Sequence, residues 1–100
     1  MPISNPNIAI LEFRPGPGGQ ESALWMGDLM RMYIRYAEKV GWKVNYLDND
    51  ILKISGVDVY NQLKWETGTH RVQRIPLTEK HGRIQTSTAA VAVYPQVSSQ

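Results

Sequence analysis

A long amphipathic segment, residues 20–40, constrains the fold of this chain more than any other feature of its sequence. Its apolar residues recur at steps of three and four, the spacing of one face of an α-helix. Residues 14–19 before it contain two prolines and three glycines, which must turn. Gly41 after it is typical of a helix C-terminus. The sequence therefore predicts a helix over residues 20–40 with the apolar stripe Ala23, Met26, Met30, Tyr33, Ala37 and Val40.

Short alternating or β-branched segments predict strands on both sides of this helix. The predicted strands are residues 8–13, 42–47, 51–54, 70–75 and 84–94. A polar turn at residues 48–50 joins two of them as a hairpin, and residues 57–65 predict a short helix with Ser55 as its candidate cap. We expect the polar residues 1–7 and those from Pro95 onward to lie outside regular structure.

The order of these elements indicates an α+β fold. A strand, a long helix, a hairpin, a short helix and a final strand pair suit a two-layer sandwich. We predict a mainly antiparallel sheet of about four or five strands with both helices on one face. One hundred residues support one small domain, so we expect residues 1–100 to form a single domain.

Composition excludes several kinds of site. The chain has no cysteine, which excludes disulfides and thiolate metal ligands. Its two histidines, His70 and His81, are not spaced as zinc ligands, so we expect no metal and no cofactor. No apolar run reaches the length of a membrane span and residues 1–7 do not resemble a signal peptide. We expect a cytoplasmic monomer without a membrane partner, an organellar matrix remaining open.

Positive charge is concentrated in one part of the chain. The net charge is only +2, yet residues 64–83 hold five Lys or Arg against two acids. Such local bias suits an anionic partner, although a solvated charged surface explains it equally well. The candidate contacts to RNA backbone are His70, Arg71, Arg74, Lys80 and Arg83.

Polar side chains suited to reading bases lie among these cations. In residues 68–78, Gln73 precedes the turn Pro76-Leu77-Thr78, and residues 82–87 repeat the combination of a basic residue, an amide and hydroxyls. Basic groups can hold phosphates while short polar side chains reach base edges. The pattern indicates a site that reads the sequence of an RNA.

Several segments together resemble one family. They are Glu-Phe-Arg-Pro-Gly-Pro-Gly-Gly-Gln-Glu-Ser-Ala (12–23), Leu-Lys-Trp-Glu-Thr-Gly-Thr-His-Arg-Val-Gln-Arg-Ile-Pro-Leu-Thr-Glu (63–79) and Gly-Arg-Ile-Gln-Thr-Ser-Thr-Ala-Ala-Val-Ala-Val-Tyr-Pro (82–95). The chain resembles the codon-recognition (PCRF) domain of bacterial-type class I peptide-chain release factors from about residue 8 to 95. The turn at residues 76–78 resembles the Pro-x-Thr form, which implies reading of UAA and UAG.

The resemblance implies a role for each matching position. The stop-codon residues that it implies are Gly18, Glu21, Gln73, Pro76, Leu77, Thr78, Gln85 and Thr86. The first two match readers of the first uridine, and the threonine of Pro-x-Thr matches the contact to bases one and two. Gln73 and Thr86 match the pair that reads the third base. The implied partners are the small-subunit decoding centre, its ribosomal RNA and the mRNA stop codon.

Two alternatives stay open beside codon reading. Gln85 stands where the family has a histidine that stacks on the second base, which leaves room for a ribosome- or RNA-binding relative without codon discrimination. Gly18-Gly19-Gln20 also repeats the tripeptide of the hydrolytic loop of these factors, but an amphipathic helix follows it here. We interpret it as a turn entering a helix. We therefore expect no catalysis in residues 1–100, with the N-terminal helical domain and the GGQ hydrolytic domain absent from them.

Overall fold

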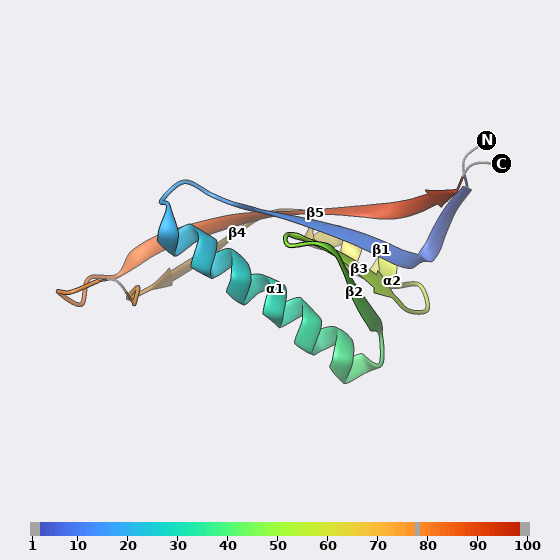
Figure 1. Cartoon of the computed structure of the whole chain (residues 1–100), viewed down its shortest axis with the longest axis horizontal. Helices are drawn as coiled ribbons and strands as arrows, with labels where there is room; N and C mark the ends of the chain where they lie inside the picture. Colours follow the sequence, from blue (N-terminus) through green and yellow to red (C-terminus); the bar gives the residue numbers. More distant parts are fainter. Residues whose placement is uncertain (1–2, 78, 99–100) are drawn as a thin grey trace.

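The computed structural model describes residues 3–77 and 79–98 and contains one five-stranded sheet and two α-helices. The elements are β1 (Ile3–Pro15), α1 (Gln20–Val40), β2 (Lys43–Asp48), β3 (Ile51–Ser55), α2 (Val59–Leu63), the 3₁₀ turn η1 (Lys64–Glu66), β4 (Gly68–Arg74) and β5 (Gln85–Ser98). The strand order is β2-β3-β1-β5-β4, and each neighbouring pair is antiparallel (Figure 1). The predicted α+β fold is confirmed.

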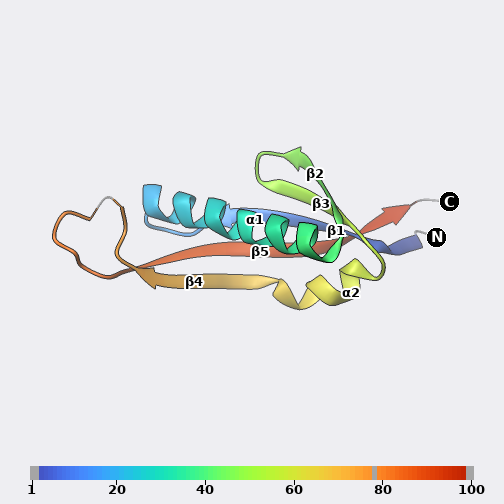
Figure 2. The ribbon, with the colours of Figure 1, turned by 90° about the horizontal axis from the view of Figure 1, so that it is seen from below.

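Both described helices pack on the same face of the sheet, as Figures 1 and 2 show. The core lies between the two layers, where Leu11 and Phe13 of β1 meet Leu29 and Tyr33 of α1. The other face of the sheet carries no described helix. Neither described helix combines the length and the apolar character that crossing a membrane would need.

The buried stripe of α1 is shifted from the predicted one. Met30, Tyr33 and Ala37 are buried as predicted, but Ala23 and Val40, at the two ends, are exposed. Ser22 is buried instead, because its hydroxyl donates a hydrogen bond to the carbonyl of Pro17 at 2.7 Å. The polar residue thus turns inward to close the glycine-rich turn, and the apolar residue beside it turns outward.

The helix ends where the sequence predicts. Gly41 adopts a left-handed backbone with φ of 85°, and its N–H bonds to carbonyls of the last helical turn. Such a conformation strains any residue with a side chain, so glycine is the residue expected there.

The two long inner strands, β1 and β5, are longer than predicted. Residues 3–5 pair with residues 96–98, so the expectation that the polar ends lie outside regular structure was wrong. Antiparallel pairing is made by backbone groups and does not require apolar side chains. A register shift between Asn5 and Ala9 accommodates Pro6, which has no N–H to donate to the ladder.

The short helix is also placed differently from the prediction. Ser55 is the last residue of β3 and not a cap, and α2 begins only at Val59. Asp58 precedes it with a left-handed φ of 58°, and its N–H is bound by the side chain of Asn7 at 2.8 Å. A long-range contact therefore fixes the start of this helix, which local sequence could not indicate.

Candidate nucleic-acid interface

Those predicted reading residues that the structure describes gather at one end of the elongated molecule. The loop of residues 75–84, between β4 and β5, and the first turn of α1 both lie at this end (Figure 1). The N–H of Gly16 donates to the carbonyl of Thr88 at 2.8 Å, which ties the turn before α1 to the start of β5. Gly18 and Glu21 are thereby held beside the strand that carries Gln85 and Thr86.

Gln73 and Thr86 are direct partners across the β4–β5 ladder, and both are exposed. The next pair in the ladder is Arg74 with Gln85. Successive strand residues point to opposite faces. Arg74 bonds to α1, so the Arg74–Gln85 pair belongs to the helical face and the Gln73–Thr86 pair to the open face. The structure therefore brings the two predicted third-base readers side by side and points Gln85 the other way.

A single carboxylate organises the loop. Glu79 Oε2 accepts hydrogen bonds from the N–H of His81 at 2.7 Å and of Arg83 at 3.1 Å, and Oε1 accepts from the Arg83 guanidinium at 3.0 Å. The Glu79 side chain is only 4% exposed because the loop closes around it. Pro76 is buried and Leu77 is 94% exposed, so the loop presents Leu77 outward. Thr78 lies outside the described residues.

We expect Glu79→Gln to loosen this loop, because a neutral amide cannot replace a carboxylate that accepts hydrogen bonds from both His81 and Arg83. Amide hydrogen exchange at His81 and Arg83, followed by NMR, should accelerate. Hydrogen bonds from Arg83 and then from His81 hold the pKa of Glu79 below its ordinary value. The loop contacts should therefore persist above that ordinary value and be lost as the pH falls through the lowered pKa. Glu38→Gln, an exposed change on α1, should alter neither amide, and unchanged exchange in Glu79→Gln would refute this role.

Arg74 is fixed against α1. Its Nη1 donates to Asp28 Oδ2 at 2.7 Å, and its guanidinium lies 5.8 Å from the ring centre of Trp25. Trp25 in turn donates its indole N–H to the carbonyl of His70 at 3.0 Å. The hydrogen bond from Arg74 lowers the pKa of Asp28, against the opposing effect of burial and with a further contribution from Arg31. Arg74 thus joins β4 to α1 while 36% of its side chain stays exposed.

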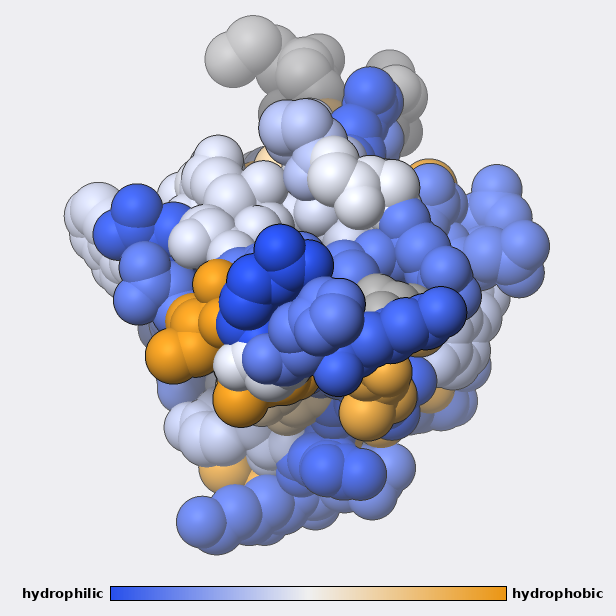
Figure 3. Space-filling model, turned by 90° about the vertical axis from the view of Figure 1, so that its left-hand side faces the viewer, coloured by the Kyte–Doolittle hydropathy of each residue, from blue (hydrophilic) through white to orange (hydrophobic). Residues whose placement is uncertain are grey.

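The other predicted RNA contacts differ in how freely they face outward. Arg71 and Lys80 are exposed and make no ion pair within the described part of the chain. Arg83 binds Glu79 and remains 69% exposed. His70 is half-buried, with Nε2 at 2.7 Å from the carbonyl oxygen of Glu66 and its ring edge-on to that of Tyr33. Figure 3 views this end of the molecule and shows a mostly hydrophilic surface with separate apolar patches.

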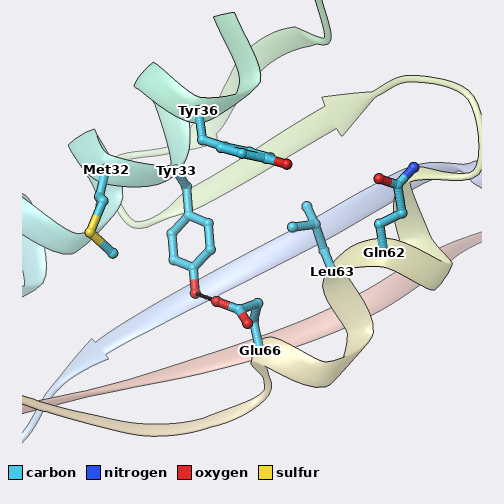
Figure 4. A pocket seen from close by; sticks show the side chains of 6 residues that line it. All are labelled: Met32, Tyr33, Tyr36, Gln62, Leu63 and Glu66. Atoms are coloured by element: carbon cyan, nitrogen blue, oxygen red, sulfur yellow. Dashed lines mark hydrogen bonds between the residues drawn. The ribbon is translucent and has the colours of Figure 1, made fainter. Parts of the chain in front are cut away.

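A hollow of about 320 Å³ lies between α1 and the α2–η1 segment (Figure 4). It is lined by Met32, Tyr33, Tyr36, Gln62, Leu63 and Glu66. The Tyr33 hydroxyl donates to Glu66 at 2.7 Å, and burial raises the pKa of Tyr33, with that hydrogen bond adding to the effect. Across residues 3–77 and 79–98 no group of three or more potential metal ligands occurs.

The sequence profile of the PCRF domain matches residues 4–91 of the chain. The chain belongs to the PCRF domain family. The match covers most of the chain and includes the first turn of α1, the β4–β5 loop and the Gln73–Thr86 pair. The family resemblance inferred from the sequence is confirmed.

Named relatives of this PCRF domain are peptide-chain release factors. Peptide chain release factor 1 of Hydrogenobaculum sp. is 53% identical over 97 residues, which cover 87% of this chain and 27% of that protein. Peptide chain release factor 1 of Lawsonia intracellularis is 52% identical over 105 residues, which cover 95% of this chain and 29% of that protein. The chain therefore spans less than a third of the length of these relatives.

Structural similarity agrees with this assignment. RF2 of Thermus thermophilus matches with a TM-score of 0.82 and 37% sequence identity, covering 89% of this chain and 28% of that one. The likeness extends over nearly the whole PCRF domain, so the fold implied by the family and the fold observed are the same.

Sequence reasoning missed the residues that hold this PCRF domain's interface in place. None of these residues was a predicted reader, yet each bonds to a segment that carries one: Glu79, Asp28, Trp25 and Ser22. The opposite charges of Glu79 and Arg83, four residues apart, were a detectable signal. No sequence signal indicated the hydrogen bond between Trp25 and His70, because the two residues are 45 positions apart in sequence.

Proposed function

We propose that this PCRF domain recognises the stop codons UAA and UAG in the ribosomal decoding centre during translation termination. The observation that carries the proposal is the exposed Gln73–Thr86 pair, near the end of the ladder from which the β4–β5 loop extends and close in sequence to Thr88, which binds the turn before α1. The names and the 50–53% identity of the release factor 1 relatives support it. Hydrolysis of peptidyl-tRNA is assigned to a separate domain, and residues 1–100 act as one recognition domain.

The chemistry of the pair suits the third codon position. A glutamine amide and a threonine hydroxyl each donate and accept hydrogen bonds, so together they satisfy either adenine or guanine. Gln85 points to the opposite face of the strand, which suits a residue that separates the second base from the third. Thr78 is assigned to bases one and two, with Pro76 and Leu77 shaping its loop.

The first base is assigned to the start of α1. A uracil edge offers oxygen acceptors and one N–H donor. N–H groups in the first turn of a helix can donate to the oxygens, and a carboxylate such as that of Glu21 can accept from the N–H. Gly18 has φ of 117°, a conformation that suits glycine and allows a base to approach the backbone closely.

The proposed partners follow from the charged groups around this edge. Arg71, Lys80 and Arg83 are assigned to phosphates of ribosomal RNA or mRNA, and Arg74 and His70, on the helical face of β4, to further contacts with RNA backbone or ribosome. We propose a monomer acting in the cytoplasm or an organellar matrix.

Equilibrium binding to ribosomes carrying UAG, UGA or UGG in the decoding site tests the proposal. We expect UAG to be preferred over both others. Thr86→Val should reduce binding to UAG about tenfold, because it removes a hydroxyl facing the base and keeps the side-chain shape. Thr69→Val is the matched control, because Thr69 lies on β4 on the same face of the sheet as Thr86. It should leave the affinity for UAG unchanged. Equal affinity for UAG and UGG would refute codon reading. Unchanged selectivity in Thr78→Ala would refute the assignment of Thr78 to bases one and two.

The same experiment separates a second candidate function. Gln85 lacks the aromatic face of the family's histidine, which favours a ribosome- or RNA-binding module without codon discrimination. Equal affinity for stop and sense codons, with strong binding to both, is its expected result. An esterase role for Gln20 is less consistent with its position as the first residue of the packed helix α1. Hydrolysis of peptidyl-tRNA that disappears in Gln20→Ala would restore that role.

A further inference from the structure

A second positively charged site lies beside the proposed reading edge. A shallow pocket of about 370 Å³ is formed where α1 crosses the end of β4. It is lined by Trp25, Asp28, Arg31, Met32, Arg35 and Arg74. Three guanidinium groups face one carboxylate, so the lining carries an excess of positive charge. Arg31 and Arg35 lie outside the segment whose charge the sequence singled out.

Contacts within the protein hold two of these guanidinium groups in place. Asp28 binds Arg31 through one carboxylate oxygen and Arg74 through the other. The ring of Trp25 supports Arg74 and is itself anchored to the carbonyl of His70. Side chains that are already ordered lose little conformational freedom when a ligand binds, which favours binding.

The pocket keeps donors for a ligand after these contacts are made. A guanidinium has five N–H donors, and Arg74 and Arg31 each use one terminal nitrogen on Asp28. Arg35 is exposed and makes no ion pair within the described residues. Because both carboxylate oxygens of Asp28 are already bound by arginines, the remaining donors meet little competition from it. The arrangement suits an anion with several oxygens.

We propose that this pocket binds a backbone phosphate of RNA. Planar guanidinium groups match the oxygen geometry of a phosphate, and a neighbouring tryptophan is typical of single-stranded RNA sites. The inference rests on the proposed function, which places RNA at the start of α1. Trp25 lies five residues beyond Gln20, about 8 Å further along the helix axis, so the same RNA or its neighbour can reach the pocket.

The test compares Arg35→Gln with Lys39→Gln in the full 100-residue chain. Both changes remove one exposed positive charge from α1, but only Arg35 lines the pocket. Affinity is measured at several salt concentrations for two probes: small ribosomal subunits carrying UAG or UGG, and a short protein-free single-stranded RNA. Thermal unfolding followed by circular dichroism verifies that both variants fold.

Arg35→Gln should weaken binding to both probes about tenfold at low salt, by the same factor for UAG and UGG. The slope of log affinity against log salt should fall by about one. Lys39→Gln should stay within about twofold of the unmodified chain. Equal losses in the two variants would overturn the proposal, as would no binding to either probe at low salt.

The outcomes also separate this pocket from codon reading. An unmodified chain without preference for UAG, whose affinity still falls only in Arg35→Gln, would refute codon reading and support the pocket. If the unmodified chain prefers UAG while Arg35→Gln and Lys39→Gln bind with equal affinity, codon reading is supported and the pocket is refuted. A loss on ribosomal subunits without a loss on protein-free RNA would indicate an acidic protein surface and overturn the assignment to RNA.

Discussion

Phe13→Ala should lower the free energy of unfolding by about 3–5 kcal/mol. Phe13 lies in the middle of the core with no exposed surface, and its ring packs 5.8 Å from that of Tyr33. Truncation leaves a cavity between β1 and α1 that rigid neighbouring elements cannot fill. Because small domains are stable by only about 5–15 kcal/mol, a large share of the total would be lost. Urea denaturation followed by tryptophan fluorescence measures the change.

Tyr46→Ala is the matched control for this prediction. Tyr46 is a large aromatic residue on β2 of the same sheet, but 62% of it is exposed. Its truncation should cost about 1 kcal/mol or less, since it removes little buried surface. Similar losses in the two variants would contradict the location of the core between β1 and α1.

Gly16→Ala should both destabilise the fold and disturb the proposed reading edge. A methyl group at this position would lie 1.9 Å from the Thr88 hydroxyl oxygen and 2.9 Å from the Thr88 carbonyl oxygen, so the two segments must separate. The separation stretches the bond from the Gly16 N–H to Thr88, which holds the turn before α1 against β5. We expect a loss of about 1–3 kcal/mol in stability and reduced preference for UAG over UGG in ribosome binding.

Gly56→Ala separates the local effect from general destabilisation. Its methyl group would lie 2.1 Å from the Trp42 ring, a collision between the end of β3 and the start of β2, apart from the turn at Gly16. Stability should fall by a similar amount while codon preference is retained. Equal loss of preference in both variants would show that selectivity follows global stability and not the position of the turn at Gly16.

The periodic parts of the fold were predictable from the sequence. The helix over residues 20–40 and the hairpin of β2 and β3 are as expected, because their side chains alternate or recur with a fixed period. The extensions of β1 and β5 were not, since residues 3–5 and 96–98 pair through backbone groups that no side-chain pattern reports. The start of α2 was also missed because Asn7, far away in sequence, fixes it.

The candidate site was predictable in its residues more than in its geometry. The family resemblance selected Gln73 and Thr86, and only the strand register showed that they face each other while Gln85 points away. The loop's dependence on Glu79 required the hydrogen bonds themselves. The roles of all these residues at the codon stay predictions. The position of Thr78, which lies outside the described residues, stays a prediction as well.

The pairing of Ile3 with Ser98 has a practical consequence. Both strands reach the same end of a molecule 56 Å long, and the β4–β5 loop lies at the other end (Figure 1). A fluorophore or surface linker attached near either of these residues would sit far from the loop. The domain can thus be immobilised through the end that carries Ile3 and Ser98, while the β4–β5 loop at the other end stays accessible to a binding partner.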